Sequence, residues 1–532
     1  MAEDPNPYNS TSAIEADVSQ TSVGWILVAT ILASSMAFID STALNVALPA
    51  LQADLAATGR ELLWIVNAYM LLLSALTLTG GSLGDRYGRK RVFIIGISVF
   101  AGASVMAGLS PTSETLILAR GFQGIGGALM VPGSLAIISA SIPAGERGTA
   151  IGTWSAFTTL TTILGPVLGG VLASAGLWRA VFFINVPLAA FALLATARWV
   201  PESRDEEATR LDWLGSVVVT LSLAAITYGA IEAPERGLDR PYVGAGLVLG
   251  LIGLVAFIFI ERWVEKPMVP LSLFKSRDFS GANLLTLMLY AALNAAFFFL
   301  SLTLIQAQGY QARQAGFATL PMAVLLALLS RWAGGLVHRY GARGPLIIGP
   351  GLAGFGFFGL SLPDLVSGAS SYWTTYLPGI ALIGVGMGIT VAPLTTVVMS
   401  APPQKQVGVA SGVNNAIARV AGVLAIAIFG GLALLSFRQV LTTRAQELPL
   451  RPQQQTELIA EAEKLGEAEP PPSLSQGEAK QAERAIRLSL LTTFKRTAIA
   501  SAGLSWLGAL AAALLIGREE DGWDPESERA PA

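Results

Sequence analysis

The chain has 532 residues, of which 53% are hydrophobic and only 13% are charged. An ordinary soluble domain would carry about 25% charged residues, so this composition indicates a membrane protein. The net charge of -2 gives no reason to expect nucleic acid as a partner. Cysteine is absent, which excludes disulfides, a thiol nucleophile and a cysteine-ligated metal site.

Fourteen apolar stretches are long enough to cross the ~30 Å hydrocarbon core of a bilayer. Each should be a helix, because lipid offers no hydrogen-bond partner to an open strand edge. They predict an all-α integral membrane protein with fourteen transmembrane helices. The stretches cover 23–49, 62–84, 92–110, 114–140, 148–174, 179–198, 212–231, 242–261, 280–306, 314–337, 344–362, 372–400, 408–436 and 497–516.

The orientation follows from the lysines and arginines of the short loops, which favour the cytoplasmic side. The six loops on one side hold fourteen of these residues, whereas the six on the other hold only Arg60, Arg236, Arg240 and Arg313. We therefore expect residues 1–22 and 517–532 to be cytoplasmic tails. A bacterial-type inner membrane is the expected location, with the lipid bilayer as the surrounding partner.

Two parts of the chain repeat each other. The stretch "GGSLGDRYGRKRVFIIG" (80–96) recurs as "AGGLVHRYGARGPLIIG" (333–349), and "SIPAGERGTAIG" (141–152) recurs as "APPQKQVGVASG" (401–412). An internal duplication explains both matches. It predicts a six-helix bundle at 23–198, a second at 280–516, and two inserted helices at 212–261. Parallel repeats with a site between them are typical of one architecture of secondary transporters.

A glycine-rich charged loop joins the second and third stretches. Gly81 and Gly88 would let two helices approach closely, and Asp85 could accept hydrogen bonds from Arg89 or from a helix N-terminus of the other half. Such contacts would form a conformational latch; Arg86 and Lys90 complete the group. Alternatively, these bases only anchor the loop on the cytoplasmic side.

Charged residues deep inside apolar helices are candidates for function, because their burial is costly. Asp40 lies about 13 Å below the outer end of the first stretch, and Arg120 lies about 9 Å below the same surface. We expect Asp40 to carry protons and Arg120 to act as its positive partner; a permanent ion pair that braces the bundle is the alternative. Arg419, near mid-membrane, could contact an anionic or carbonyl-bearing substrate or pair with helix carbonyls.

A broad substrate cavity is expected from amide and aromatic side chains inside the apolar stretches. Each of these residues could instead serve only in packing. Because Asp40 is the only deep acid, lipophilic neutral, zwitterionic or anionic small molecules fit at least as well as dications. The candidates are Asn45, Gln123, Trp154, Asn294, Phe298, Asn414, Asn415 and Arg419.

The long polar segment 438–496 lies between the last two stretches, on the side predicted to be outside. Its central "PPP" with helix-forming arms suggests a helical hairpin over the outer mouth; a flexible linker is the alternative.

Several motifs carry a resemblance to a known family. The loop "GGSLGDRYGRK" (80–90) resembles the signature loop of the major facilitator superfamily. Further stretches are similar to motifs of its fourteen-helix drug:proton antiporter branch: "IDSTALNVALP" (39–49), "LARGFQGIGGA" (118–128), "LGPVLGG" (164–170) and "SGVNNAIARVAG" (411–422). The resemblance implies proton-driven multidrug efflux by alternating access, and a helix kink at Gly165, Pro166, Gly169 and Gly170.

An enzyme is not expected, because the sequence has no Walker A loop, no H-E-x-x-H and no G-x-S-x-G. We expect no metal and no cofactor; the proton gradient would supply the energy. Protons and lipophilic small molecules are the expected partners, and accessory efflux proteins are left open. The alternative function is a metabolite or lipid transporter, or a facilitator, on the same fold.

Overall fold

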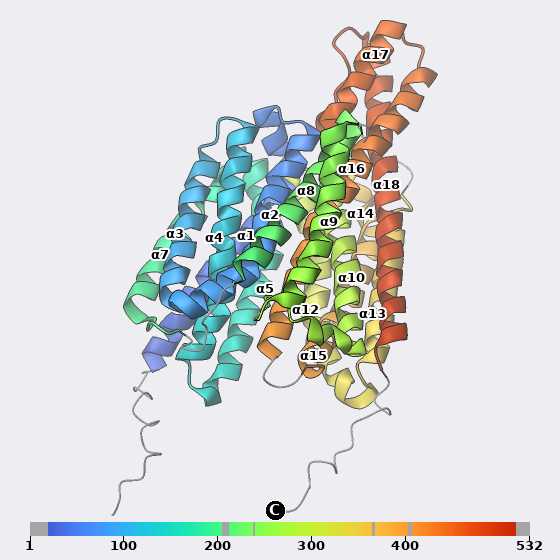
Figure 1. Cartoon of the computed structure of the whole chain (residues 1–532). Coiled ribbons are helices and arrows are strands. Elements are labelled where there is room, and N and C mark those ends of the chain that lie inside the picture. Colours follow the sequence, from blue (N-terminus) through green and yellow to red (C-terminus); the bar gives the residue numbers. More distant parts are fainter. Residues whose placement is uncertain are drawn as a thin grey trace, which may run out of the picture.

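The computed structural model describes residues 20–204, 212–237, 240–265, 267–363, 368–402 and 407–517. In that part of the chain all regular structure is helical and no strand occurs. Figure 1 shows long helices lying side by side, with one helical hairpin projecting from an end of the bundle. The predicted tails lie outside the described residues, apart from positions 20–22 and 517.

The helices follow one another with short connections. In chain order they are α1 (Gln20–Leu55), α2 (Gly59–Tyr87), α3 (Arg89–Gly108), α4 (Ser113–Ser141), α5 (Ala144–Ser174), α6 (Ala180–Phe183), α7 (Asn185–Trp199), α8 (Trp213–Arg236), α9 (Pro241–Trp263), η2 (Leu271–Lys275), α10 (Arg277–Leu302), η3 (Thr303–Ala307), α11 (Ala312–Ala318), α12 (Leu320–Tyr340), α13 (Arg343–Leu360), η4 (Ala369–Ser371), α14 (Tyr372–Thr375), α15 (Leu377–Ser400), α16 (Val407–Glu447), α17 (Pro452–Ala460), η6 (Glu461–Glu467) and α18 (Gln476–Leu515).

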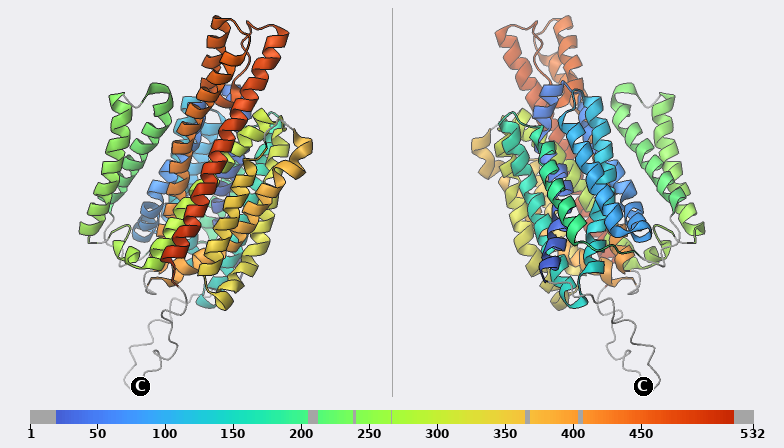
Figure 2. Two further views of the ribbon diagram at one scale, coloured as in Figure 1. Left: turned by 90° about the vertical axis from the view of Figure 1, so that its right-hand side faces the viewer. Right: turned by 90° about the vertical axis from the view of Figure 1, so that its left-hand side faces the viewer.

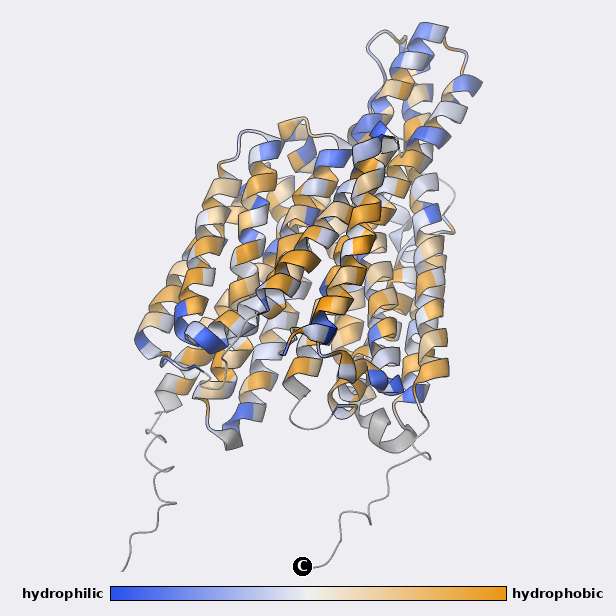
Figure 3. Cartoon of the chain, viewed as in Figure 1, coloured by the Kyte–Doolittle hydropathy of each residue, from blue (hydrophilic) through white to orange (hydrophobic). Residues whose placement is uncertain are grey.

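Within the described residues, thirteen helical segments are long and apolar enough to cross a membrane. Figure 3 shows their apolar residues as a band across the bundle, while polar residues gather at its ends and on the hairpin. The remaining predicted stretch, 344–362, forms α13, in which glycines and prolines interrupt the apolar residues. It packs against α15 and α18 and so belongs to the same bundle.

The helices form the two bundles and the inserted pair that the repeats predict. The first bundle contains α1 to α7, and the second contains α10 to α16 together with α18. Between them in sequence, α8 and α9 pack on each other, and α8 packs against α2 and α16, one helix from each bundle. Figure 2 shows this pair at the side of the molecule, where most of α9 faces outward. The all-α fold class is therefore confirmed.

The segment 438–496 is a helical hairpin rather than a linker. Helices α16 and α18 extend beyond the bundle, and α17 and η6 lie between their ends (Figure 2). A capping box of Ser475 and Glu478 starts α18, with hydrogen bonds of 3.4 and 2.8 Å. The Gln52 amide of α1 donates to the carbonyl of Lys464 at 2.6 Å. We call this side the hairpin end, and the opposite side, where the loop at 84–90 lies, the loop end.

Candidate functional site

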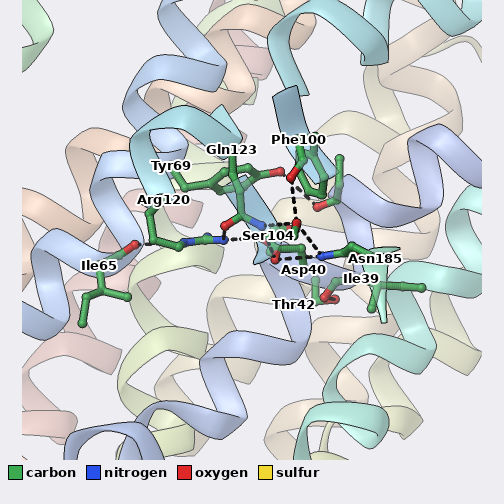
Figure 4. A network of polar contacts seen from close by, with 12 residues as sticks. Ile39, Asp40, Thr42, Ile65, Tyr69, Phe100, Ser104, Arg120, Gln123 and Asn185 are labelled. Atoms are coloured by element: carbon green, nitrogen blue, oxygen red, sulfur yellow. Dashed lines mark hydrogen bonds and ion pairs between the residues drawn. The ribbon is translucent and has the colours of Figure 1, made fainter. Parts of the chain in front are cut away.

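Asp40 of α1 and Arg120 of α4 meet inside the first bundle. Arg120 Nη1 donates to Asp40 Oδ2 in a buried ion pair, and the side chains are 1% and 0% exposed (Figure 4). The comparable depths of the two residues in the sequence predicted this proximity. A buried pair of this kind must be hydrogen-bonded on all sides to offset the loss of hydration.

Neutral polar side chains supply the other hydrogen bonds to this ion pair. Gln123 Nε2 donates to Asp40 Oδ1 at 3.1 Å, and Arg120 Nη1 donates to Gln123 Oε1 at 2.8 Å. Asn185 Nδ2 lies 3.4 Å from Asp40 Oδ1 and 3.3 Å from Ser104 Oγ. We call Asp40, Arg120, Gln123, Ser104 and Asn185 the buried polar network. Gln123 was expected in the substrate cavity but belongs to this network.

Ser104 and Asn185 were not among the predicted site residues. Ser104 lies on α3, and Asn185 begins α7. Both are fully buried. Asn185 does leave a signal in the sequence, because a buried amide within an apolar stretch requires a partner. That signal identifies a polar contact without naming its partner.

A backbone carbonyl and an aromatic ring also contact the Arg120 guanidinium. Its Nε donates to the carbonyl of Ile65 on α2 at 3.2 Å. The ring of Tyr69 lies 4.3 Å from the guanidinium carbon, a cation–π distance. The Tyr69 hydroxyl donates to the carbonyl of Ala37 on α1 at 3.1 Å. Arg120 thus links α1, α2 and α4.

A cavity of about 290 Å³ lies between the two bundles, which we call the central cavity. Helices α1 and α5 line it from the first bundle, and α10, α12 and Thr319, which lies between α11 and α12, line it from the second. Its lining is mixed, with amide, hydroxyl and apolar side chains and no acid. The lining residues are Thr42, Asn45, Val46, Thr162, Pro166, Leu293, Asn294, Phe297, Ser301, Thr319, Met322, Ala323 and Leu326.

Of the predicted cavity residues, Asn45 and Asn294 line the central cavity. Asn45 Oδ1 is buried and has no hydrogen-bond partner in the described part of the chain. Asn294 Nδ2 donates to the carbonyl of Tyr290, one turn earlier on α10, at 2.8 Å. Asn45 therefore retains an acceptor that a bound molecule could use.

The other predicted cavity residues lie elsewhere. Trp154 Nε1 donates to Ser34 Oγ at 3.2 Å and so ties α5 to α1. Asn414 Nδ2 donates to Asn283 Oδ1 at 3.0 Å, which joins α16 to α10. Phe298 is packed in the hydrophobic core, whereas its neighbour Phe297 lines the cavity. Asn415 is exposed on α16 and bonds only to its own helix.

Arg419 is partly buried on α16, between the bundles. It lies close enough to Tyr69 to interact with it electrostatically.

The predicted kink motif brings three helices close together. A Cβ atom on Gly169 would lie 2.1 Å from the carbonyl oxygen of Ala43, so α5 touches the backbone of α1 there. On the other side, a Cβ on Gly170 would lie 2.5 Å from the carbonyl oxygen of Ala312 in α11. Gly165 and Pro166 lie in the same close-packed stretch of α5, which continues as one helix through the proline.

The charged loop contacts its own bundle in this structure. Asp85 Oδ1 accepts from Arg89 Nε at 2.9 Å, and the Lys90 backbone N–H donates to Glu202 Oε1 at 3.1 Å. Gly88 has φ 109°, a conformation that favours glycine and lets the chain turn directly from α2 into α3. Arg86 lies over the ring of Tyr87, and Gly81 faces Pro132 of α4. The latch between halves stays a prediction.

A second cavity, of about 400 Å³, lies beneath the inserted helices. Its lining comes from α2, α8, α9, α10, α16 and the segment after α9, and is almost entirely apolar. Among the described residues, no cluster of three or more histidines or acids could hold a metal ion.

Two helical bundles with a cavity between them, and a buried ion pair within one bundle, define the general class of helical membrane transporters. The sequence places the chain within that class, because residues 30–426 match the model of the Major Facilitator Superfamily. The chain belongs to this superfamily.

Known relatives include export and resistance proteins. The chain is 33% identical over 407 residues to the multidrug resistance protein Stp of Mycobacterium tuberculosis (strain CDC 1551 / Oshkosh), covering 76% of this chain and 75% of Stp. It is 30% identical over 510 residues to the tetracenomycin C resistance and export protein of Streptomyces glaucescens, covering 95% and 93%. Among solved structures, a bacterial homolog of the human lysosomal transporter Spinster matches with a TM-score of 0.63 and 16% identity, over 95% of this chain and 100% of that one. The last match supports the fold alone.

Proposed function

We propose that this protein is a proton-coupled exporter of lipophilic small molecules, of the fourteen-helix antiporter branch, and that it works by alternating access. The carrying observation is the buried polar network around Asp40, because it places a titratable group on the same helix that lines the central cavity. The relatives named for multidrug resistance and export favour efflux over uptake. In this proposal the membrane is a bacterial-type inner membrane, the loop end and both termini are cytoplasmic, and the hairpin end is outside.

Helix α1 provides the coupling in this proposal. Asp40 faces the buried polar network, while Thr42 and Asn45, two and five residues further along α1, line the central cavity. Protonation of Asp40 would remove the charge that attracts Arg120, and the donors of Gln123 and Asn185 would lose an anionic acceptor. The packing of α1 against its neighbours would then change at the height of the cavity.

In this proposal, helix α5 transmits the change in the packing of α1 to the other bundle. It touches α1 at Gly165 and Gly169, and α11 at Gly170. The Arg313 backbone N–H also donates to Ser174 Oγ at 2.9 Å, so the halves are in direct contact at the hairpin end. In the proposed cycle these contacts separate when the outer side opens, the substrate leaves, and a proton enters.

The test is drug accumulation in susceptible cells that express the wild type or the Asp40→Asn variant, with and without an uncoupler. We expect the wild type to lower drug accumulation only while the proton gradient is maintained. The Asp40→Asn variant should not lower accumulation under either condition. Asp54→Asn is a matched control, because Asp54 lies on the same helix and pairs with Arg179, but at an exposed position. Full gradient-dependent export by Asp40→Asn would contradict the proposal.

A second candidate function is transport or facilitated diffusion of a lipid or apolar metabolite. The almost wholly apolar cavity beneath α8 and α9 favours it, because such a lining suits an acyl chain better than a polar drug. The same cells distinguish the two functions. A facilitator would still move its substrate after Asp40→Asn and in the presence of the uncoupler.

A further inference from the structure

Arg419 differs from the charged residues that form buried ion pairs. Asp40 is paired with Arg120, and Glu232 of α8 is paired with Arg60 at 3.0 Å and with Arg236 at 2.7 Å. Within the described residues, Arg419 takes part in no ion pair and no hydrogen bond, and the neutral Tyr69 lies close enough to interact with it electrostatically. A cation at this depth is costly unless it pairs with an anion or faces water.

The face of α16 that carries Arg419 points to the seam between the bundles. Three positions spaced by three or four residues, Asn415, Arg419 and Gly422, share this face. A Cβ atom on Gly422 would lie 2.5 Å from the Met70 side chain of α2 and 3.2 Å from the Asn294 side chain of α10. Asn294 lines the central cavity, and Arg419 lies about 4.5 Å along the helix axis from Gly422. Arg419 is therefore at the loop-end rim of the cavity.

The charge balance of this region is positive. Asp40 is neutralised by Arg120, and both of its oxygens are held by donors of the buried polar network. The residues that line the central cavity include neither an acid nor a base, so Arg419 at the rim is the nearest charge that a bound molecule could meet from α16. The guanidinium of Arg419 is thus an uncompensated cation beside a cavity whose remaining polar groups are amides and hydroxyls.

We propose that Arg419 is an anion-binding group and that the central cavity takes lipophilic organic anions, with the apolar body against α10 and α12 and a carboxylate on the guanidinium. Arginine suits this role because its planar fork matches the two oxygens of a carboxylate. The inference rests on the proposed transport function for its physiological meaning, but the binding site is testable without transport.

The experiment measures equilibrium binding to the purified full chain in an uncharged detergent. Naphthaleneacetate, naphthaleneacetamide and naphthylethylamine present the same ring with an anionic, a neutral and a cationic group. The wild type should bind the carboxylate about tenfold to a hundredfold more tightly than the amide, the range expected for a hydrogen bond to a charged group. The amine should bind most weakly.

Arg419→Gln should reduce carboxylate binding to the level of the amide and leave amide binding unchanged, which also shows that the cavity is intact. Arg419→Lys should keep part of the preference, since it retains the charge but not the fork. Arg438→Gln is the matched control, because it removes the same charge from an exposed site on the same helix. Equal or absent binding of the three compounds by the wild type, or a carboxylate preference that survives in Arg419→Gln, would overturn the inference.

The outcomes separate this inference from the proposed function. Arg419-dependent carboxylate binding without gradient-driven export would count against proton-coupled efflux alone. Gradient-driven export that does not depend on the charge of the substrate, and is unchanged in Arg419→Gln, would count against the anion site alone.

Discussion

Asp40 and Arg120 are separated by 80 residues in the chain, yet they form the most deeply buried ion pair of the described structure. Each depends on the other, because either charge alone would be left inside an apolar bundle. Removing one partner of a buried pair usually costs about 3–5 kcal/mol, whereas removing both charges is tolerated far better. A single variant that costs more stability than the double variant therefore indicates a true ion pair, rather than two residues that are only neighbours.

We therefore predict that Arg120→Gln lowers the thermal midpoint of the purified protein strongly, at a cost of about 3–5 kcal/mol. The double variant Asp40→Asn/Arg120→Gln should regain most of that stability but not proton-driven transport. Tryptophan fluorescence during heating is a suitable measurement, because the chain has 11 tryptophans.

Arg179→Gln provides the comparison. It breaks the ion pair with Asp54, in which the two side chains are 36% and 47% exposed. An exposed pair contributes only about 0–1 kcal/mol. If Arg120→Gln and Arg179→Gln lower the stability of the protein by similar amounts, burial does not make the Asp40–Arg120 pair more stabilising than an exposed pair.

At the scale of elements, α1 and α5 pack so closely that glycine is required between them. The Ala43 carbonyl that faces Gly169 belongs to a helix backbone, so it cannot move aside as a flexible side chain could. Gly152, eight residues from the loop-end start of the same helix, would have no heavy atom within 4 Å of an added Cβ. Two glycines of one helix therefore serve different purposes.

The prediction is that Gly169→Ala destabilises the protein by about 1–3 kcal/mol, as overpacking usually does, and reduces export. Gly152→Ala should be neutral or stabilising by about 0.5–1 kcal/mol, because alanine loses less backbone entropy in a helix. Yield after purification, thermal midpoint and export are measured for both variants. If Gly169→Ala matches Gly152→Ala in all three, the close approach of α1 and α5 is not required.

Sequence patterns predicted where the helices lie better than where they begin and end. All fourteen apolar stretches fall in helices, because hydrocarbon leaves the backbone no other partner. Hydropathy did not predict how far helices continue beyond the apolar region. The stretch predicted at 497–516 belongs to α18, which begins at Gln476, because a capping box rather than apolarity sets that start. Likewise, the stretch predicted at 314–337 is divided between α11 and α12.

At the scale of the whole molecule, the two bundles meet directly at the hairpin end. Ser174 of α5 and Arg313 of α11 form a hydrogen bond of 2.9 Å across the seam. The proposed cycle requires this contact to open. Because the natural chain contains no cysteine, an introduced pair is the only disulfide that can form.

We predict that a Ser174→Cys/Arg313→Cys protein stops transporting when the pair is oxidised, or is bridged by a short bismaleimide, and that reduction of the disulfide restores transport. The pair Ser110→Cys/Arg179→Cys is the control, because Arg179 bonds to the Ser110 carbonyl within the first bundle at the same end. A cross-link there should leave transport unchanged. Continued transport with the first pair fully cross-linked would rule out opening at this seam.

The amino-acid sequence by itself determined the membrane setting, the positions of the helices, the duplication and the depth of Asp40 and Arg120. These features depend on apolar length, repeated motifs and distance along a helix, all of which can be counted along a chain. The tertiary structure alone decided which groups surround Asp40, that Asn414 joins α16 to α10, and that Arg419 lacks an anionic partner. A helix that is apolar on all sides gives little indication of which side faces its neighbours, so these contacts depend on how the helices are rotated and packed.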